Sequence, residues 1–344
     1  MARNRSDSRR PARLVVAGVA VVVAVLLFRR AQLINPGPTG SGLAAGSSSP
    51  GATAATSGPG GPASQGQQTS SPSRAGSPNP EAVLVGAGDI ADCTSNGDEA
   101  TATLLDHLVG TVFTLGDNAY ESGSASDFRR CYDPSWGRQL DRTKPVPGNH
   151  DYVTKNATGY FGYYGAAAGD PATGWYAYDL GAWRVYVLNS NCELVGGCQA
   201  GSAQERWLRG ELAANPHGCL LAMWHHPRFS SGMHGNDAIT ADLWTDLYDA
   251  GAELVLNGHD HDYERFAAQT PEGRADPDRG IVEMVVGTGG RSHYAFEAIR
   301  ANSLVRNDTT YGVLRLVLSA GRWSFAFLPV AGGTFTDSGS GDCH

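Results

Sequence analysis

The stretch Gly258-His259-Asp260-His261-Asp262-Tyr263-Glu264-Arg265 is the one around which the rest of the chain is organised. It follows an apolar, strand-like segment, 252–256, and Asn257-Gly258 is a turn signal. In extended backbone, residues i and i+2 point the same way. We therefore expect His259 and His261 to present two imidazoles to one small volume, such as a pair of metal ions in a cleft. One His-x-His is weak evidence, so its weight depends on the motifs upstream.

Four further motifs upstream contain residues of the types that bind metals. In chain order they are Gly88-Asp89, Gly116-Asp117-Asn118-Ala119-Tyr120, Gly148-Asn149-His150-Asp151 and Trp224-His225-His226-Pro227. Glycine before a ligand lets the backbone turn sharply at a strand end. Carboxylate, amide oxygen, imidazole and phenolate together suit Fe, Mn or Zn rather than a soft thiolate metal. A single Gly-Asp is usually only a turn, but five motifs in this order make coincidence remote.

From residue 81 onward, apolar segments alternate with helix-like periodicities. We expect strands at 82–85, 111–115, 183–189, 220–224, 254–257 and 281–286, and helices at 98–108, 203–212 and 241–249. Two further segments, 311–318 and 322–328, alternate like an antiparallel hairpin. This order predicts an α/β sandwich with functional residues on loops at the carboxyl ends of strands.

The amino-terminal part differs in composition from the rest. Residues 1–30 carry seven Arg and one Asp around an apolar run at 14–28, which predicts a signal anchor or a cleaved signal peptide that contacts the membrane. Residues 31–80 are dominated by Gly, Ser, Ala, Thr, Pro and Gln, which predicts a disordered linker. We expect a catalytic domain at 81–335 and a tail at 336–344, located outside the cytoplasm and either membrane-anchored or secreted.

Charge and cysteine content narrow the class of protein. Residues 81–344 contain 18 basic and 33 acidic side chains, so no basic surface for nucleic acid is expected. Six cysteines without a Cys-x-x-Cys pair, downstream of an export signal, favour disulfides over a zinc ribbon. Cys192 and Cys198 close the easiest loop. Pairing Cys93 with Cys131 and Cys219 with Cys343 is our guess for the rest, since sequence does not fix connectivity.

Over roughly residues 81–330, the five motifs resemble the calcineurin-like metallophosphoesterases, specifically the purple acid phosphatase branch. The resemblance implies one catalytic domain, an αββα sandwich of two mixed sheets, with a two-metal site. It implies that the first metal is held by Asp89, Asp117, Tyr120 and His261, and that Asp117 bridges to a second metal held with Asn149, His225 and His259. It also implies that His150 binds substrate or donates a proton, and that His234 stands where the branch has a further histidine.

The first motif separates the branches of this superfamily. Most members have Asp-x-His there, whereas Ala91 stands two residues after Asp89, and Tyr120 resembles the substitute ligand. Because a phenolate favours a hard trivalent ion, we expect Fe(III) at the first position and Fe, Zn or Mn(II) at the second. His226 is expected to point away from the metals, because adjacent side chains on a strand point oppositely. Arg228 could grip a phosphate oxygen, and a solvated charge is equally consistent with its position.

These features predict an exported phosphatase that hydrolyses small phosphate monoesters through a hydroxide activated by two metals. His150 or His234 would protonate the leaving alkoxide and bind substrate. Two alternatives stay open. One is a phosphodiesterase or nucleotidase that uses the same centre, and the other is a non-catalytic surface protein that binds a ligand. The natural substrate and the oligomeric state do not follow from the sequence.

Overall fold

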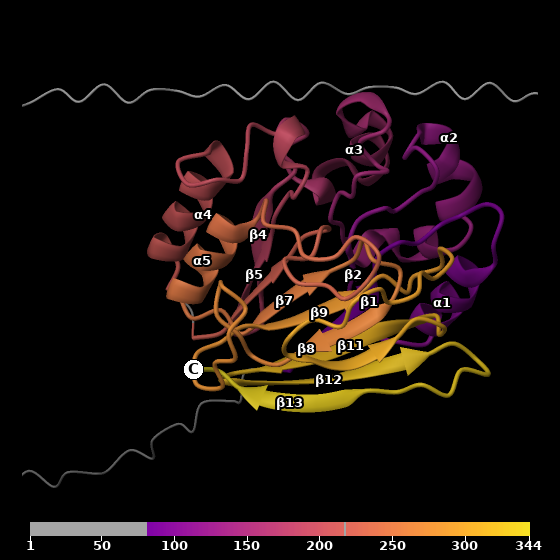
Figure 1. The fold of residues 1–344 in the computed structure, drawn as a ribbon. Coiled ribbons are helices and arrows are strands. Elements are labelled where there is room, and N and C mark those ends of the chain that lie inside the picture. Colours follow the sequence, from indigo (N-terminus) through magenta and orange to yellow (C-terminus); the bar gives the residue numbers. More distant parts are fainter. Residues whose placement is uncertain (1–80, 217) are drawn as a thin grey trace, which may run out of the picture. The chain divides into compact units, whose positions relative to one another are not determined.

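In the computed structural model, which describes residues 81–216 and 218–344, the strands form two mixed sheets (Figure 1). The first sheet has the order β13-β12-β11-β1-β2-β3 and the second has the order β10-β8-β9-β7-β6-β5-β4. The predicted α/β sandwich of two mixed sheets in one domain is therefore confirmed.

The first sheet contains β1 (Ala82–Ala87), β2 (Thr111–Thr114), β3 (Thr143–Lys144), β11 (Gly312–Ser319), β12 (Arg322–Pro329) and β13 (Ser338–Asp342). The second contains β4 (Tyr176–Leu180), β5 (Trp183–Val187), β6 (Leu220–Met223), β7 (Leu254–Asn257), β8 (Tyr263–Phe266), β9 (Val282–Val286) and β10 (Ser303–Asn307). Strands β1, β2 and β3 are parallel to one another, and so are β5, β6, β7 and β9. Each sheet thus contains a block of parallel strands, at one side of the first sheet and in the middle of the second, whose carboxyl ends can carry a site.

The helices are α1 (Gly97–Asp106), α2 (Ala125–Asp127), α3 (Thr158–Tyr164), α4 (Ala203–Ala214) and α5 (Ala241–Asp249). Helical segments of other types are η1 (Phe128–Tyr132), η2 (Trp136–Arg142), η3 (Lys155–Ala157), η4 (Gly165–Ala168) and η5 (Cys192–Leu194). The start of α4 is fixed by Ser202, whose side chain accepts a hydrogen bond from the backbone of Glu205. Helix α5 buries Leu243, Trp244 and Leu247, one face at helical spacing.

Successive side chains along β5, β6 and β7 alternate between two hydrophobic cores, one on each face of the second sheet. Val185 and Val187 of β5 belong to the core between the sheets, whereas Tyr186 belongs to a second core under α4 and α5. Leu221 and Leu220 of β6 divide between the two cores in the same way. Strands buried on both faces read as continuous apolar runs, which is why these segments were predictable without helix-like periodicity.

All six cysteines form disulfides, and the guessed pairing is confirmed. The bonds join Cys93 to Cys131, Cys192 to Cys198 and Cys219 to Cys343. The last of these bonds holds the end of the described chain against the start of β6. Within the expected tail at 336–344, residues Ser338–Asp342 form β13 and pair with β12.

The predicted signal segment at 1–30, with its membrane contact at 14–28, and the predicted linker at 31–80 lie outside the described residues. Within residues 81–216 and 218–344, no helix is both long enough and apolar enough to cross a membrane.

Candidate metal centre

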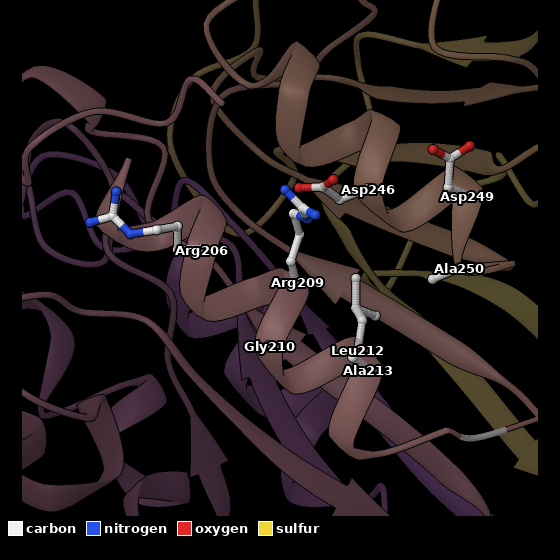
Figure 2. A pocket seen from close by; sticks show the side chains of 8 residues that line it. All are labelled: Arg206, Arg209, Gly210, Leu212, Ala213, Asp246, Asp249 and Ala250. Atoms are coloured by element: carbon white, nitrogen blue, oxygen red, sulfur yellow. The ribbon is translucent and has the colours of Figure 1, made fainter. Parts of the chain in front are cut away.

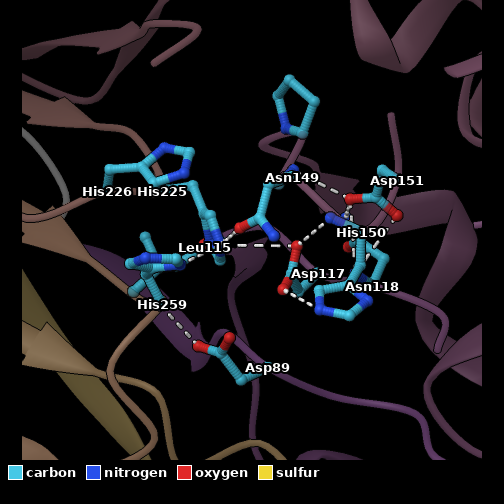
Figure 3. A network of polar contacts seen from close by, with 12 residues as sticks. Asp89, Leu115, Asp117, Asn118, Asn149, His150, Asp151, His225, His226 and His259 are labelled. Carbon is cyan, nitrogen blue, oxygen red and sulfur yellow. Dashed lines mark hydrogen bonds and ion pairs between the residues drawn. The ribbon is translucent and has the colours of Figure 1, made fainter. Parts of the chain in front are cut away.

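The carboxyl ends of parallel strands from both sheets meet at one place, which Figure 3 shows from close by. The predicted site residues come from the loops after these strands. Asp89 follows β1, Asp117 and Tyr120 follow β2, Asn149 and His150 follow β3, His225 follows β6, and His259 and His261 follow β7. Segments that lie up to about half the chain length apart in sequence thus contribute to one site, which we call the hollow.

A first group of donors surrounds the hydroxyl of Tyr120. This oxygen lies 3.0 Å from Oδ1 of Asp89, 3.1 Å from Oδ2 of Asp117 and 3.2 Å from Nε2 of His261. Nδ1 of His261 donates to the carbonyl of Ser292 at 2.7 Å, which leaves Nε2 to face the group. Such a bond on the far nitrogen is how proteins orient metal-binding imidazoles.

A second group surrounds Nε2 of His225. This nitrogen lies 3.3 Å from Oδ1 of Asp117, 2.9 Å from Oδ1 of Asn149 and 3.2 Å from Nδ1 of His259. Nδ1 of His225 donates to the carbonyl of Leu115 at 2.7 Å, so its orientation is also fixed from behind. Asp117 places one carboxylate oxygen in each group, which is the position that the bridging role requires.

The backbone at the ligand loops differs from the extended form assumed for His259 and His261. His259 has a φ of 72°, and the amides of Asp260 and Asp262 bond to the carbonyls of Gly258 and Asp260, two residues back. The segment is a series of tight turns, so the argument from strand alternation was wrong even though both imidazoles reach the hollow. Asp89 and Asp117 also have positive φ, at 58° and 50°. Left-handed backbone at non-glycine residues costs free energy and concentrates at functional sites.

Two glycines next to ligands make room for another ligand. A Cβ on Gly148 would lie 2.1 Å from Oδ1 of Asp117, and one on Gly258 would lie 2.6 Å from Oδ2 of Asp89. The sequence suggested that these glycines serve sharp turns. Their contacts show that close approach between two loops is the stronger requirement.

The centre concentrates buried charge. Asp89 is fully buried and Asp117 is 1 % exposed. Burial, together with the nearby Asp117 carboxylate, raises the pKa of Asp89 well above its usual range. Burial would raise the pKa of Asp117 as well, but the imidazoles of His225, His150 and His259 outweigh it and lower the pKa. Burial and both carboxylates raise the pKa of Tyr120.

These donors fit metal ions. Oxygen and nitrogen atoms of Asp89, Asp117 and His225 all lie within 4.8 Å of one another, and all three residues are buried. A bound cation would favour the charged forms of Asp89 and Tyr120 and so would oppose the rise that burial causes in the pKa of each. With carboxylate, phenolate, amide and imidazole donors and no thiol, the set suits Fe, Mn or Zn.

The two predicted proton donors lie beside different ligands, His150 next to Asp117 and His234 next to His259. Nε2 of His150 lies 3.9 Å from Oδ2 of Asp117, and its Nδ1 bonds to the carbonyl of Glu121 at 2.7 Å. The ring of His234 lies 4.0 Å from that of His259, and its Nδ1 bonds to Oδ1 of Asp260 at 2.8 Å. Both imidazoles are thus oriented from one nitrogen, with the other left for the hollow.

His226 does not point away as predicted. Strand β6 ends at Met223, so strand alternation no longer applies two residues later. The rings of His226 and His259 lie 4.4 Å apart, and donor atoms of His225, His226 and His259 all lie within 4.8 Å of one another. The double histidine directly after an apolar strand was the sequence signal that could have revealed this.

The hypothesis for Arg228 is not supported by its position. Nη2 of Arg228 donates to the carbonyl of Pro271 at 3.2 Å, and the guanidinium lies over the ring of Phe229. Phe229 packs in the core under α4 and α5. Arg228 thus contacts Phe229 and Pro271, neither of which is a predicted ligand, and its role on a phosphate oxygen stays a prediction.

Two supporting features were missed at the sequence level. The carboxylate of Asp151 accepts from the backbone of Gly148 at 2.9 Å and from Nδ2 of Asn118 at 2.8 Å, so it joins the second and third ligand loops. Burial raises the pKa of Asp151 to about 7. Tyr294 stacks on His261 with ring centres 4.0 Å apart. Asp151 is visible in the third motif but its bond to Asn118 is not, and Tyr294 does not stand out in sequence because it packs on His261 from a distant loop.

A family model described as calcineurin-like phosphoesterase matches residues 73–263, more than half of the chain. The chain belongs to the calcineurin-like phosphoesterase family. Purple acid phosphatase 15 of Arabidopsis thaliana is 26% identical over 240 residues, and purple acid phosphatase 18 of the same plant is 32% identical over 95 residues. These matches cover 59% and 26% of this chain but only 44% and 21% of the relatives, so the chain spans less than half the length of either.

Solved structures agree on the fold. The purple acid phosphatase PPD1 from yellow lupin seeds has a TM-score of 0.61 at 16% identity, covering 76% of this chain and 54% of that one. GAP50, described as the anchor in the inner membrane complex of Plasmodium, has a TM-score of 0.60 at 15% identity, covering 77% and 89%. Together with the sequence relatives, these matches support the purple acid phosphatase-like branch of the family.

A pocket elsewhere on the surface contains no part of the candidate metal centre. It has a volume of about 680 Å³ between α4 and α5 and is lined by Arg206, Arg209, Asp246 and Asp249 among others (Figure 2). None of the predicted site residues lines it. Its mixed charges, of which Arg209 pairs with Glu205 at 3.3 Å, are typical of a solvated helix surface.

Proposed function

We propose that this chain is an exported phosphatase that hydrolyses phosphate monoesters at a binuclear metal centre. The proposal rests on the position of the Asp117 carboxylate between two separate donor groups. Its Oδ2 lies 3.1 Å from the Tyr120 hydroxyl, and its Oδ1 lies 3.3 Å from Nε2 of His225. A carboxylate shared in this way is what a pair of neighbouring metal ions needs. The three disulfides support a location outside the cytoplasm.

Two metal ions would supply positive charge for phosphate oxygens and lower the pKa of a water molecule. The first would be held by Asp89, Asp117, Tyr120 and His261, and the second by Asp117, Asn149, His225 and His259. A phenolate donor favours Fe(III) at the first position, with Fe, Zn or Mn(II) at the second.

The residues around the metals would orient the substrate and move its protons. When the ester breaks, the leaving alkoxide needs a proton, and an imidazole titrates near the working pH. The bond from His234 to Asp260 at 2.8 Å fixes which nitrogen of that ring faces the hollow. His150 is fixed in the same way by the Glu121 carbonyl. One of them would donate this proton, while the other binds a phosphate oxygen.

A phosphodiesterase or nucleotidase with the same centre is the alternative within this class. The two are separated by comparing turnover of an aryl phosphate with that of a bis-aryl phosphate. We favour the monoester because both relatives that match in sequence are purple acid phosphatases.

A non-catalytic surface protein is the alternative of another class. The fold alone does not separate it from an enzyme, since GAP50 is described as an anchor and shares the fold. The separating feature is the donor set, because a binding protein has no need for two complete groups around one buried carboxylate. The short distances among donor atoms of the seven predicted ligands support the enzyme over the binding protein.

Elemental analysis of the full chain, purified without added metal, tests the proposal together with a phosphatase assay on the same sample. We expect about two metal ions per chain, including iron, and turnover of aryl phosphates. Metal without turnover favours the binding protein, and a sample that takes up no metal when it is offered contradicts the proposal.

A further inference from the structure

A small pocket opens beside the second donor group. Its volume is about 190 Å³, and its lining consists of Ser190, Asn191, Cys192, Glu193, Leu194, His226, Asp237 and Ile239. None of the ligands assigned above lines it. The pocket belongs to three loops, which follow β5, follow β6 and precede α5.

His226 connects this pocket with the centre. One of its ring nitrogens is a donor atom within 4.8 Å of donor atoms of His225 and His259, and the same side chain lines the pocket. Nδ1 of His226 is engaged by the hydroxyl of Ser190 at 2.7 Å. Nε2 is therefore the nitrogen that this ring, which is largely buried, can offer to a bound molecule.

The walls of the pocket are fixed before any ligand binds. The Ser190 hydroxyl also accepts from the backbone of His226 at 3.0 Å, which ties the loop after β5 to the loop after β6. The disulfide between Cys192 and Cys198 closes the first loop. Sγ of Cys192 lies 3.9 Å from the carbonyl of Ile239, on the third loop. A preformed wall selects ligands without an ordering cost.

The pocket carries negative charge at its rim. Glu193 is exposed, and Asp237 is half-buried with one oxygen accepting from the backbone of Ile239 at 2.9 Å. Leu194 and Ile239 are 63% and 38% exposed, which makes them unusual among the large apolar side chains described. Among the residues that line the pocket, none is lysine or arginine. The pocket thus combines exposed apolar side chains and polar groups with two carboxylates, so it disfavours a ligand that carries a further negative charge.

We propose that this pocket receives the alcohol portion of the substrate and selects phosphate monoesters of small amino alcohols. The inference rests on the proposed phosphatase function and names its substrate class. Hydrolysis breaks the bond between phosphorus and the alcohol oxygen, water supplies the new oxygen of inorganic phosphate, and the alcohol leaves with a proton. With phosphate at the metals, the alcohol carbons would pass His226, and the ammonium group would face Asp237 and Glu193.

Size and charge support this choice over a nucleotide. Pockets for drug-sized ligands measure about 300–1,000 Å³, so about 190 Å³ suits a leaving group of a few heavy atoms. A leaving group with a phosphate or carboxylate would face two like charges, and such opposition is how sites reject a competitor. An ammonium group would gain from the same charges.

Three phosphate esters of similar size test the inference with the full chain. Phosphoethanolamine has a cationic leaving group, ethyl phosphate a neutral one and phosphoglycolate an anionic one. We expect kcat/KM to fall in that order, with phosphoethanolamine at least about tenfold above phosphoglycolate. Turnover of all three at equal kcat/KM, or the reverse order, would overturn this inference and leave the phosphatase function standing. Turnover of none would overturn both.

Removing one carboxylate at a time identifies the source of the preference. Glu193→Gln and Asp237→Asn should each lower the ratio of kcat/KM for phosphoethanolamine to that for phosphoglycolate by about two- to fivefold, as expected for partly exposed charges. Asp278→Asn is the matched control, since Asp278 is exposed and lies outside the pocket. It should leave the ratio unchanged. Two independent carboxylates keep the test valid if one variant does not fold, and an unchanged ratio in a folded pocket variant contradicts the proposal.

Discussion

The guanidinium carbon of Arg291 lies 4.6 Å from the centre of the Tyr120 ring. The same guanidinium pairs with Asp92 at 2.5 Å and with Glu121 at 2.6 Å, so it is held in place on both sides. The backbone of Arg291 donates to the carbonyl of Asp89 at 2.9 Å. A cation held over an aromatic ring is attracted by its π electrons, and the attraction grows when the ring carries negative charge. Arg291 would therefore stabilise the phenolate form that Tyr120 needs in order to bind a metal.

This contact predicts a change in colour. If Tyr120 binds Fe(III), the iron-loaded protein should be violet through charge transfer from the phenolate, and Tyr120→Phe should remove the colour. Because the cation lowers the energy of the phenolate electrons, Arg291→Gln should move the absorption maximum to longer wavelength. Arg291→Lys, which keeps a positive charge, should move it less. Visible spectra at equal iron content measure these shifts. A colourless wild-type protein with full iron, or an unmoved maximum in Arg291→Gln, would contradict the assignment.

The shared position of Asp117 predicts distinct metal stoichiometries. Asp117→Asn should lose both metals and at least about 100-fold in phosphatase activity, since even supporting residues of metal sites account for 10–100-fold. His261→Ala should lose only the first metal and Asn149→Ala only the second. Elemental analysis per chain gives the count.

Thermal unfolding adds an independent measure of the same prediction. Metal that binds only the folded state stabilises it by about 4 kcal/mol at 1,000 times its dissociation constant. Added metal should therefore raise the wild-type midpoint and leave that of Asp117→Asn unchanged. Equal metal content in wild type and Asp117→Asn would rule out the bridge.

Much of the fold and of the centre could be predicted because local sequence patterns indicate both the regular elements and the ligand motifs that follow them. Ala241–Asp249 and Leu254–Asn257 were predicted with their observed bounds, since the first has apolar residues at helical spacing and the second is a short, mostly apolar run. The ligand motifs were visible because each follows a strand end. Strand β8 (Tyr263–Phe266) was missed as a strand, because its buried Glu264 reads as an exposed charge. The backbone of Ser231 satisfies that carboxylate at 2.7 Å, and this contact between distant segments is invisible in sequence.

The error at His226 and the unforeseen contacts of Arg228 have a similar origin. His226 and Arg228 follow β6 at a distance where neither strand alternation nor helix periodicity applies. Their directions are set by partners from other loops, Ser190 for His226 and Pro271 for Arg228. Sequence patterns describe regular elements, whereas the directions of side chains after a strand depend on tertiary contacts.

The contact between His234 and Asp260 predicts which imidazole acts as the acid. Burial alone would raise the pKa of Asp260, but bonds from His234 and Ser230 lower it, so the carboxylate stays charged and fixes the ring. If His234 donates the proton, His234→Asn should lower kcat by about 10²–10⁴ for alkyl phosphates. The loss should be much smaller for p-nitrophenyl phosphate, whose leaving group needs little protonation.

Asp260→Asn provides the matching test, because it leaves the imidazole in place but removes its orienting charge. It should lower kcat for alkyl phosphates less than His234→Asn does, again with little effect on the nitrophenyl ester. His150→Asn is the comparison at the other predicted proton donor. If His150→Asn shows the dependence on leaving group and His234→Asn does not, the two roles are exchanged.

The buried contact between Glu253 and His344 predicts a pH dependence of stability far from the metals. Both oxygens of Glu253 bond to His344, at 2.8 Å to its backbone amide and at 2.8 Å to Nδ1. Burial raises the pKa of Glu253 to about 7, and the bond from the His344 amide only partly opposes this shift. Between the unfolded pKa, about 4.5, and 7, the folded protein therefore binds more protons at this carboxyl than the unfolded chain does. The resulting stabilisation is complete below pH 4.5 and is lost as the pH rises through 7.

Glu253→Gln should remove this dependence, because the amide keeps an acceptor oxygen but does not titrate. The free energy of unfolding of the variant, relative to wild type, should therefore increase as the pH rises from 4.5 to 7.5. Urea unfolding at several pH values measures this difference, and the titration of shared groups that do not contact Glu253 cancels; His344→Gln measures the part that comes from the contacting imidazole. Glu272→Gln is the control, since Glu272 is exposed and pairs only at the surface with Arg274. The free energy of unfolding of Glu253→Gln relative to wild type could instead be constant over this range. That result would show that the Glu253 carboxyl titrates alike in the folded and unfolded chains, and it would contradict the prediction.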